Sequence, residues 1–369
     1  MGNMRMLVTG ANGFLGRAVM AQALARGHEV VGLTRDDTPV ETGAGQIVLD
    51  LSRDTAADAE ALARAVAGCD VVIHTAAALS GDAGTRMRDT KLATRNLLAA
   101  CGAAHAGTRA GGATQPGQAP AMSGPQSGPP SDPLANHPTF PGSSPASPTL
   151  PRLVLISSIS VYDADALPEG AMIDEDAPLE RQPRSRDGYA RSKLTQERMV
   201  RDYPGEVWIL RPGTIYGPGR MWNAHVGPVL GPVLLCLGNK GQIPLVARDA
   251  CADAVVRAAE TGGGGVVNLV DSALPDRRAF LRACGPGAPP VVIPLSWRIF
   301  DLAATLGALI PRLSHRLPGL LRPRPLRARM RPAQYTNSRA QTLLGWRPGR
   351  FEDGFAQEKA REKTQEARR

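Results

Sequence analysis

The fold of this chain is decided by the stretch Met4-Arg5-Met6-Leu7-Val8-Thr9-Gly10-Ala11-Asn12-Gly13-Phe14-Leu15-Gly16. An apolar run gives way to three spaced glycines, and an alanine-rich helical pattern follows, so the stretch predicts a strand, a tight turn and a helix. The glycines allow backbone angles that other residues avoid, and they let a pyrophosphate approach the N–H groups at the helix N-terminus. We therefore expect a dinucleotide site here. A glycine-rich turn that binds nothing is the alternative.

Further apolar runs predict the rest of a sheet. They lie at 28–33, 46–49, 70–74 and 153–156, and helical patterns, one of them from about 87 to 104, separate them. Such connections cross over with a right hand and produce parallel strands. The predicted fold is α/β, a Rossmann-type doubly wound parallel sheet with a smaller C-terminal substrate-binding lobe.

The domain boundaries follow from these patterns. We expect a dinucleotide-binding domain at 1–215, a substrate lobe at 216–350 in which 250–270 return to the first domain, and a charged C-terminal tail at 351–369. Ten prolines lie between Pro116 and Pro148, interleaved with Gly, Ser, Ala and Gln. A segment of this composition cannot bury enough apolar surface to offset its ordering entropy, so we interpret 105–150 as a disordered insertion.

Composition excludes several classes of protein. Apolar residues make up 43% of the 369, which is ample for a core. The net charge of +9 is nearly all arginine, without interleaved aromatic residues, which argues against nucleic-acid binding. Five scattered cysteines indicate neither a disulfide framework nor a metal site. We expect neither a signal peptide nor a membrane-spanning helix, and therefore a cytoplasmic protein.

The end of the second predicted strand bears on cofactor choice. An acidic residue there usually holds the adenosine ribose of NAD, but this chain has Thr34 and Arg35. A guanidinium can pair with a 2′-phosphate, so we expect NADP to be preferred over NAD. The alternative interpretation of Arg35 is a solvated loop residue.

Three side chains are candidates for catalysis. Tyr189 and Lys193 are four residues apart at the start of a predicted helix and therefore share one face. One predicted element upstream, a strand ends in Ser157 and Ser158. His74 also ends a strand, but we assign it no chemistry because a lone histidine there is more often packed.

In five segments the chain resembles an extended short-chain dehydrogenase/reductase, and the segments occur in the order of that family. They are 9–16 (TGANGFLG), 74–77 (HTAA), 157–162 (SSISVY), 189–193 (YARSK) and 211–219 (RPGTIYGPG). The stretch 335–348 looks like the segment that closes the substrate lobe. The resemblance implies a catalytic set of Ser158, Tyr189 and Lys193.

The resemblance also implies a cofactor site built from the glycine-rich turn and the strand ends. Asp50 would lie near the adenine, and 212–215 would border the nicotinamide. The full set is Gly10, Asn12, Gly13, Phe14, Leu15, Gly16, Arg35, Asp50, Leu51, Thr75, Ala76, Ala77, Ser157, Tyr189, Lys193, Pro212, Gly213, Thr214 and Ile215.

Departures from the family pattern concern the substrate side. Thr90 stands in place of a usual Asn, Asp163 in place of a glycine, and Ala250 in place of an acid. Nucleotide-sugar members often carry an Asn where this chain has Thr214, and the segment 221–235 is apolar. We favour the branch that resembles 3β-hydroxysteroid dehydrogenases and dihydroflavonol reductases, with a nucleotide-sugar epimerase or dehydratase as the alternative.

The expected reaction is hydride transfer between nicotinamide and a secondary alcohol or ketone. Tyr189 would exchange the proton, Ser158 would orient the substrate oxygen, and Lys193 would bind the ribose and lower the pKa of Tyr189. A scaffold that binds NADP(H) without turnover is a further alternative.

The arginines from Arg312 to Arg331 follow an amphipathic stretch, 291–310. Such a run can contact an anionic membrane surface or hold a phosphorylated substrate, but we favour a solvated face with a packed helix. The expected partner is a small-molecule substrate. Whether the chain forms a homodimer is left open.

Overall fold

The computed structural model describes residues 2–76, 83–110, 150–238, 240–308 and 322–367. A seven-stranded sheet is formed by strands between residues 5 and 269 and is parallel throughout, in the order β12-β7-β5-β4-β1-β2-β3. The strands are β1 (Arg5–Thr9), β2 (Glu29–Thr34), β3 (Gly45–Val48), β4 (Val71–His74), β5 (Arg152–Ile156), β7 (Val207–Pro212) and β12 (Gly265–Leu269). The predicted Rossmann-type α/β fold is confirmed.

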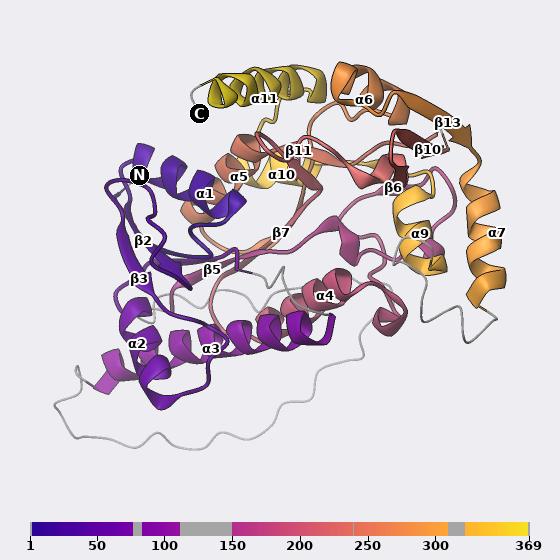
Figure 1. Ribbon diagram of the computed structural model, residues 1–369. Helices are drawn as coiled ribbons and strands as arrows, with labels where there is room; N and C mark the ends of the chain where they lie inside the picture. The colour runs from indigo at the N-terminus through magenta and orange to yellow at the C-terminus, as the bar shows by residue number, and fades with distance from the viewer. Residues whose placement is uncertain (1, 77–82, 111–149, 239, 309–321, 368–369) are drawn as a thin grey trace.

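Helices cover both faces of this sheet (Figure 1). One face carries α1 (Phe14–Ala25), α5 (Arg248–Glu260) and α10 (Ser338–Leu344). The other carries α2 (Ala56–Val66), α3 (Ala83–Ala110) and α4 (Gly188–Arg201). Alternate residues of β1 supply the two cores, since Met6 and Val8 pack on the α1 side and Leu7 on the α2 side. Because both faces of the central strands are buried, these strands are continuous apolar runs in the sequence.

A smaller lobe lies beside the carboxyl end of the sheet (Figure 1). Among the described residues it contains a three-stranded sheet in the order β13-β10-β9, with helices beside it. Its elements are β9 (Val229–Leu230), β10 (Val233–Leu237), α6 (Arg277–Cys284), β13 (Val291–Leu295), α7 (Trp297–Ala308) and α9 (Pro323–Met330). Two short parallel pairs also lie outside the large sheet: β8 (Thr214–Tyr216) with β11 (Leu245–Ala247), and β6 (Met172–Ile173) with β14 (Gln334–Tyr335).

The structure adds helices at two of the expected boundaries. Helix α3 continues to Ala110, so the first residues of the supposed 105–150 insertion are helical, and 111–149 lie outside the described residues. The expected charged tail contains helix α11 (Phe351–Glu366), because Phe351 and Phe355 are buried against Tyr216 and Phe280. Two aromatic side chains one helical turn apart give this charged segment a face that packs.

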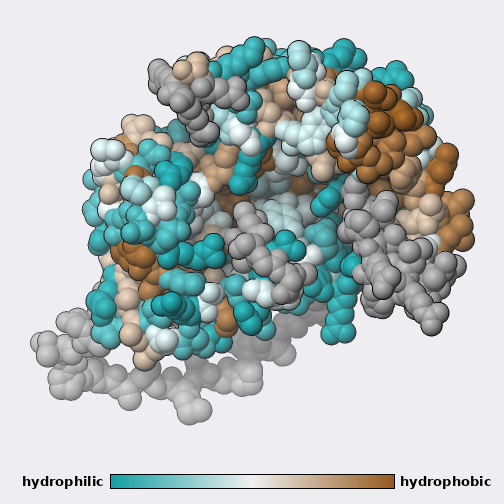
Figure 2. Space-filling view, viewed as in Figure 1, coloured by the Kyte–Doolittle hydropathy of each residue, from teal (hydrophilic) through white to brown (hydrophobic). Residues whose placement is uncertain are grey.

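The lobe exposes a group of apolar side chains at its outer side (Figure 2, upper right). They belong to β13 and α7: Val291, Val292, Ile293, Ile299, Leu302 and Leu306 are 41–63% exposed. The predicted amphipathic stretch therefore turns part of its apolar side outward. None of the helices in the described residues is both long and apolar enough to cross a membrane.

Candidate active site

A cavity of about 1130 Å³ lies where the carboxyl ends of the sheet strands meet the smaller lobe. It brings together the cofactor and catalytic residues expected from the sequence, with one exception. Ala77 lies outside the described residues. The residues that line the cavity include Gly10, Asn12, Gly13, Phe14, Leu15, Gly16, Arg35, Asp50, Leu51, Thr75, Ala76, Ser157, Ser158, Tyr189, Lys193, Pro212, Gly213, Thr214 and Ile215.

The glycine-rich turn forms one end of the cavity. Gly10 has a φ of +68°, and a Cβ on Gly16 would overlap the Gly10 carbonyl oxygen, so neither position tolerates a side chain. Helix α1 begins after Gly13 without a side-chain cap and has no acidic residue in its first turn. Its first N–H groups are therefore available to an anion, and the turn fits the pyrophosphate of a dinucleotide.

Two charged residues follow β2 at this end. Arg35 lines the cavity as expected, but so does Asp36, which the sequence reasoning missed. The Asp36 carboxylate accepts hydrogen bonds from Asn12 Nδ2 at 3.0 Å and from the Thr38 backbone N–H at 3.1 Å. The Thr38 bonds and the Asn12 bond lower the pKa of Asp36. A cation and an anion thus stand side by side where an adenosine ribose would lie.

Asp50 lies further along the same wall. Burial works to raise its pKa, but hydrogen bonds from Ser52 and the charges of Arg35 and Arg53 outweigh that effect, and the pKa is lowered. Its Oδ1 accepts from the Ser52 backbone N–H at 2.9 Å and from the Ser52 hydroxyl at 2.7 Å. Asp50 is therefore a fixed anion at the adenine end.

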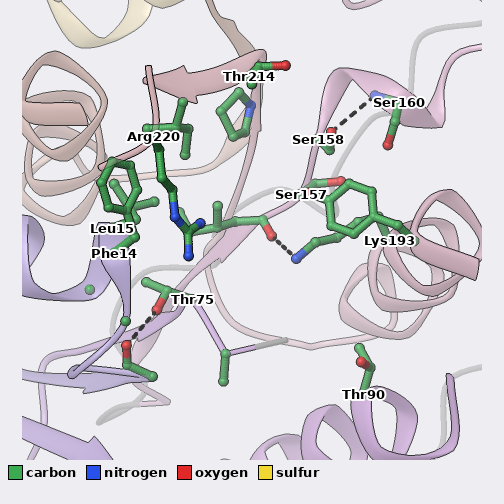
Figure 3. Close-up of a pocket in the computed structure, with 18 of the residues that line it drawn as sticks. Phe14, Leu15, Thr75, Thr90, Ser157, Ser158, Ser160, Lys193, Thr214 and Arg220 are labelled. Carbon is green, nitrogen blue, oxygen red and sulfur yellow. Dashed lines mark hydrogen bonds between the residues drawn. The ribbon is translucent and has the colours of Figure 1, made fainter. Parts of the chain in front are cut away.

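Ser158, Tyr189 and Lys193 converge in the middle of the cavity. Ser158 follows β5 by two residues and its hydroxyl accepts a hydrogen bond from Ser160 N–H at 3.2 Å (Figure 3). Tyr189 and Lys193 come from the first turns of α4, which Asp187 caps by accepting a hydrogen bond from the Ala190 N–H. Tyr189 is 41% exposed because its ring faces the open cavity.

Lys193 is held by buried partners. Its Nζ donates to the Ile156 carbonyl at 2.7 Å (Figure 3). It also donates to Gln196 Oε1 at 3.0 Å. Burial lowers the pKa of Lys193 to about 8, although the charge of Glu197 opposes this change. The ammonium is therefore still mainly protonated at neutral pH but loses its proton under mildly alkaline conditions.

In the protein without cofactor, Lys193 does not lower the pKa of Tyr189 as expected. Although the ring faces the open cavity, the cavity walls shield it from bulk water and raise the pKa of Tyr189, the Ser158 hydroxyl acts in the opposite direction, and Asp187 adds to the rise. The Lys193 Nζ lies 5.9 Å from the centroid of the tyrosine ring and points to Ile156 and Gln196. For the protein without cofactor, the expectation of a lowered Tyr189 pKa is therefore corrected to a raised one.

Sequence reasoning assigned His74 no chemistry, and in the structure it is packed in a buried group of polar contacts beside Lys193. Gln196, which accepts from Lys193, directs its Nε2 to His74 Nε2 at 3.2 Å and to Thr94 Oγ1 at 3.0 Å. The other ring nitrogen contacts Thr9 Oγ1 at 2.9 Å. Burial and the charge of Lys193 lower the pKa of His74 to about 3, so the ring is neutral. This chain of contacts connects Lys193 to the end of β1.

A second buried network fixes the strand ends. Ser157 donates to Glu197 at 2.5 Å, so its hydroxyl is already committed. Glu197 also receives Arg211 Nε at 2.9 Å and Nη2 at 2.7 Å, and both side chains are 2% exposed. Arg211 Nη1 in turn donates to the Tyr162 hydroxyl at 3.0 Å. These bonds hold β5, β7 and α4 in register around the candidate catalytic residues.

Beyond Tyr189 the cavity extends into the smaller lobe. Here the walls combine apolar and polar side chains from η1 (Ile159–Val161), η4 (Ala224–Val226), α9 and the segment before η4. They include Ser160, Ile173, Met221, Trp222, Asn223, His225, Ala328, Arg329 and Tyr335. Arg220 reaches from the same segment towards Phe14, with its guanidinium carbon 4.7 Å from the ring centroid (Figure 3).

Comparison with known proteins defines the class. Residues 6–269 match the NAD dependent epimerase/dehydratase family, and the chain belongs to that family. The resemblance to extended short-chain dehydrogenases/reductases is confirmed, and the chain is an NAD(P)-dependent oxidoreductase or epimerase/dehydratase.

Particular relatives include both reductases and an epimerase. A 3-diazoavenalumate denitrifying reductase from Streptomyces sp is 29% identical over 377 residues, covering 96% of this chain and 100% of the relative. A 2-alkyl-3-oxoalkanoate reductase from Stenotrophomonas maltophilia is 38% identical over 102 residues, 27% of this chain and 29% of the relative. The solved Thermus thermophilus UDP-glucose 4-epimerase in complex with NAD matches with a TM-score of 0.60 at 21% identity, covering 95% and 96% of the two chains.

Proposed function

We propose that this protein is an NAD(P)-dependent reductase that interconverts a ketone and a secondary alcohol. The observation that carries the proposal is the cavity in which the glycine-rich turn, Ser158, Tyr189 and Lys193 meet. A relative that aligns along nearly the whole chain is named as a reductase, of a diazo compound, which supports a reduction. The relative named for reduction of an oxo compound, the 2-alkyl-3-oxoalkanoate reductase, aligns over 27% of this chain and supports a ketone as the substrate.

The proposed roles of the side chains are those that the family resemblance implies. When bound, the nicotinamide would supply or accept the hydride. Tyr189 would donate its hydroxyl proton to the carbonyl oxygen during reduction and take it back during oxidation. Ser158 would donate a hydrogen bond to the same oxygen, and Lys193 would donate to the nicotinamide ribose. Because the pKa of Tyr189 is raised in the chain alone, we infer that bound cofactor contributes to its activation.

We propose NADP(H) as the preferred cofactor, because Arg35 lines the cavity at the end of β2 and a guanidinium can pair with a 2′-phosphate. The nearby Asp36 carboxylate opposes this preference, since it would repel that phosphate and accept the 2′-hydroxyl of NAD. We infer that the attraction of Arg35 for the 2′-phosphate is stronger than the repulsion by Asp36, because the Asp36 carboxylate already accepts hydrogen bonds from Asn12 and Thr38.

The test is a screen of ketones, 3-oxo acids and their esters against the purified full chain with NADPH and with NADH, followed by the absorbance of the reduced nicotinamide. We expect turnover that Tyr189→Phe lowers by about 10²–10⁴-fold with little change in cofactor affinity. Retention of most of the activity by Tyr189→Phe would exclude the assigned proton donor.

A nucleotide-sugar epimerase or dehydratase is the second candidate, and the solved epimerase of the same fold motivates it. The matching assay incubates UDP-glucose and related UDP-sugars with the protein and follows the sugar product by chromatography. We expect no conversion, since Thr214 stands where sugar-nucleotide members often carry an Asn. Epimerisation without net consumption of reduced cofactor would replace the reductase proposal.

A further inference from the structure

The lobe end of the cavity holds an arginine whose charge has no partner in the described part of the chain. On α9 and just beyond it, Arg324 pairs with Glu180 at 2.5 Å, Arg327 with Asp301 at 2.6 Å and Arg331 with Asp165 at 4.0 Å. Arg329, between them, lines the cavity, and no carboxylate of the described residues lies within ion-pair distance of it. Carboxylates therefore pair with the arginines on either side of Arg329, whereas the charge of Arg329 itself is available to a ligand in the cavity.

Asn223 supplies a second, independent indication of a ligand. It is 3% exposed and lines the same end of the cavity. Its Oδ1 accepts the His225 backbone N–H at 2.8 Å and contacts His225 Nδ1 at 2.7 Å. A backbone N–H can only donate, so the amide must present its oxygen there and its Nδ2 elsewhere. That Nδ2 has no hydrogen-bond partner among the described residues.

The neighbouring histidine keeps this arrangement fixed. Its backbone carbonyl accepts from Arg277 Nε at 2.9 Å, which anchors η4. Burial and the charges of Arg329 and Arg277 lower the pKa of His225 to about 3, so the ring stays neutral and its Nδ1–H can donate to Asn223. Arg277 Nη2 also donates to the backbone carbonyl of Arg329 at 3.2 Å, so one guanidinium joins η4 to α9 and keeps Arg329 near Asn223.

This end of the cavity combines hydrogen-bond donors with apolar walls. Ser160 contributes a further buried hydroxyl oxygen with no partner among the described residues. Met221, Trp222 and Ala328 supply apolar surface next to these groups. An unpaired buried donor costs free energy, which a ligand with acceptor oxygens would recover. A guanidinium beside such donors selects an oxyanion.

We propose that Arg329 and Asn223 form a subsite for the oxyanion group of the substrate, a carboxylate or a phosphate carried on an apolar organic body. The proposal rests on the proposed reductase function, because the same molecule would present its carbonyl to Tyr189. Arg329 binds the negative charge of the oxyanion, and Asn223 donates one hydrogen bond to it. The apolar walls contact the organic part of the substrate between this subsite and Tyr189.

The test measures ligand binding by calorimetry on the full chain saturated with the oxidised cofactor. Decanoate and cinnamate probe the carboxylate, their methyl esters are the neutral controls, and UDP probes the phosphate. Arg329→Gln removes the charge, Arg329→Lys restores it, and Arg322→Gln removes an exposed charge preceding the same helix. Cofactor affinity of each variant reports on folding.

We expect a carboxylate or UDP to bind at least about tenfold more weakly to Arg329→Gln, with partial recovery in Arg329→Lys and no change in Arg322→Gln. The probe that responds identifies the source of the oxyanion. Asn223→Ser should weaken the same probe by a smaller factor. Equal binding of acids and esters, or equal effects of Arg329→Gln and Arg322→Gln, would overturn the subsite.

The two proposals fail in different ways. If the oxyanion probes bind in an Arg329-dependent manner but no ketone is reduced, the subsite stands and the reductase function is wrong. If ketones are reduced in a manner sensitive to Tyr189→Phe, yet oxo acids and oxo esters have equal KM in the wild type and in Arg329→Gln, the function stands and the subsite is wrong.

Discussion

At the scale of single residues, Lys193 is the group whose charge responds most directly to its surroundings. Its Nζ is enclosed by the Ile156 carbonyl and Gln196, and burial lowers its pKa to about 8. Only the protonated ammonium has enough donors for both of these acceptors and for a ribose hydroxyl. Its charge therefore connects pH to cofactor binding.

We predict that cofactor affinity of the wild type weakens as pH rises through about 8, because Lys193 loses its proton there. Lys193→Met should bind cofactor weakly at every pH and should lose this pH dependence, as well as most turnover. Ser158→Ala is the matched control, with near-normal cofactor affinity, an intact pH dependence and reduced turnover. Fluorescence titration with NADPH from pH 6.5 to 9.5 measures the cofactor affinity of the wild type and of both variants. The absorbance of the reduced nicotinamide measures their turnover. A Lys193→Met variant that keeps the wild-type pH profile would assign the titration to another group.

The second prediction at this scale concerns Arg35 and Asp36. Arg35→Ser should weaken NADPH by roughly tenfold or more relative to NADH, because a charge-assisted contact to the 2′-phosphate is lost. Asp36→Ser should shift the ratio of the two affinities in the opposite direction. Titration of both variants with both cofactors tests this prediction. Equal ratios in Arg35→Ser and the wild type would show that Arg35 is a solvated loop residue.

At the scale of secondary-structure elements, His74 connects its own strand to three others. It ends β4, contacts Thr9 at the end of β1 and Thr94 on α3, and receives Gln196 from α4. The ring is 1% exposed and neutral. An element junction built on a neutral imidazole is sensitive to acid.

The sign of that sensitivity follows from linkage. The pKa of His74 is about 3 in the folded chain, below the ordinary 6.5, so the unfolded chain binds the proton first as pH falls. Stability therefore falls between pH 6.5 and about 3, by up to roughly 1.4 kcal/mol per pH unit from this group. His225 adds in the same direction, while Asp271, with its pKa raised by burial to about 6, acts against both.

We predict that His74→Gln, although less stable than the wild type near pH 7, shows a flatter fall in unfolding free energy from pH 6 to 4. Urea unfolding at several pH values measures the slope. Gln357→Ala, at an exposed position on α11, is the control and should leave the slope unchanged. Parallel curves for the wild type and His74→Gln would exclude His74 as the acid-sensitive group.

At the scale of the whole molecule, the seven-stranded sheet resumes at β5 after the proline-rich segment. Helix α3 ends at Ala110 and β5 begins at Arg152, where it pairs with β4. Replacing 111–148 with a flexible Gly/Ser linker of about a dozen residues should leave the melting temperature and cofactor affinity nearly unchanged, because loop length affects stability only logarithmically. Scanning calorimetry with and without NADPH measures both. A large loss of stability would mean that the segment packs and is not a disordered insertion.

The sequence alone was sufficient for the parallel sheet, the glycine-rich turn and the Tyr189/Lys193 pair. Each of these signals is local, since strand, turn and helix patterns and a four-residue spacing all act within a short stretch of chain. Family resemblance extended the cofactor set to the ends of strands far apart in the chain.

Only the tertiary structure decided which charges are satisfied and which remain free. The arginines around α9 look alike in the sequence, but Arg324 meets Glu180, 144 positions away, while Arg329 faces the cavity near Asn223. The same holds for Asp36, which joins Arg35 at the cofactor end, and for Phe351 and Phe355, which turn a charged segment into a packed helix. Pairing and burial depend on neighbours that chain folding brings together over long separations, and the pattern of adjacent residues does not contain that information.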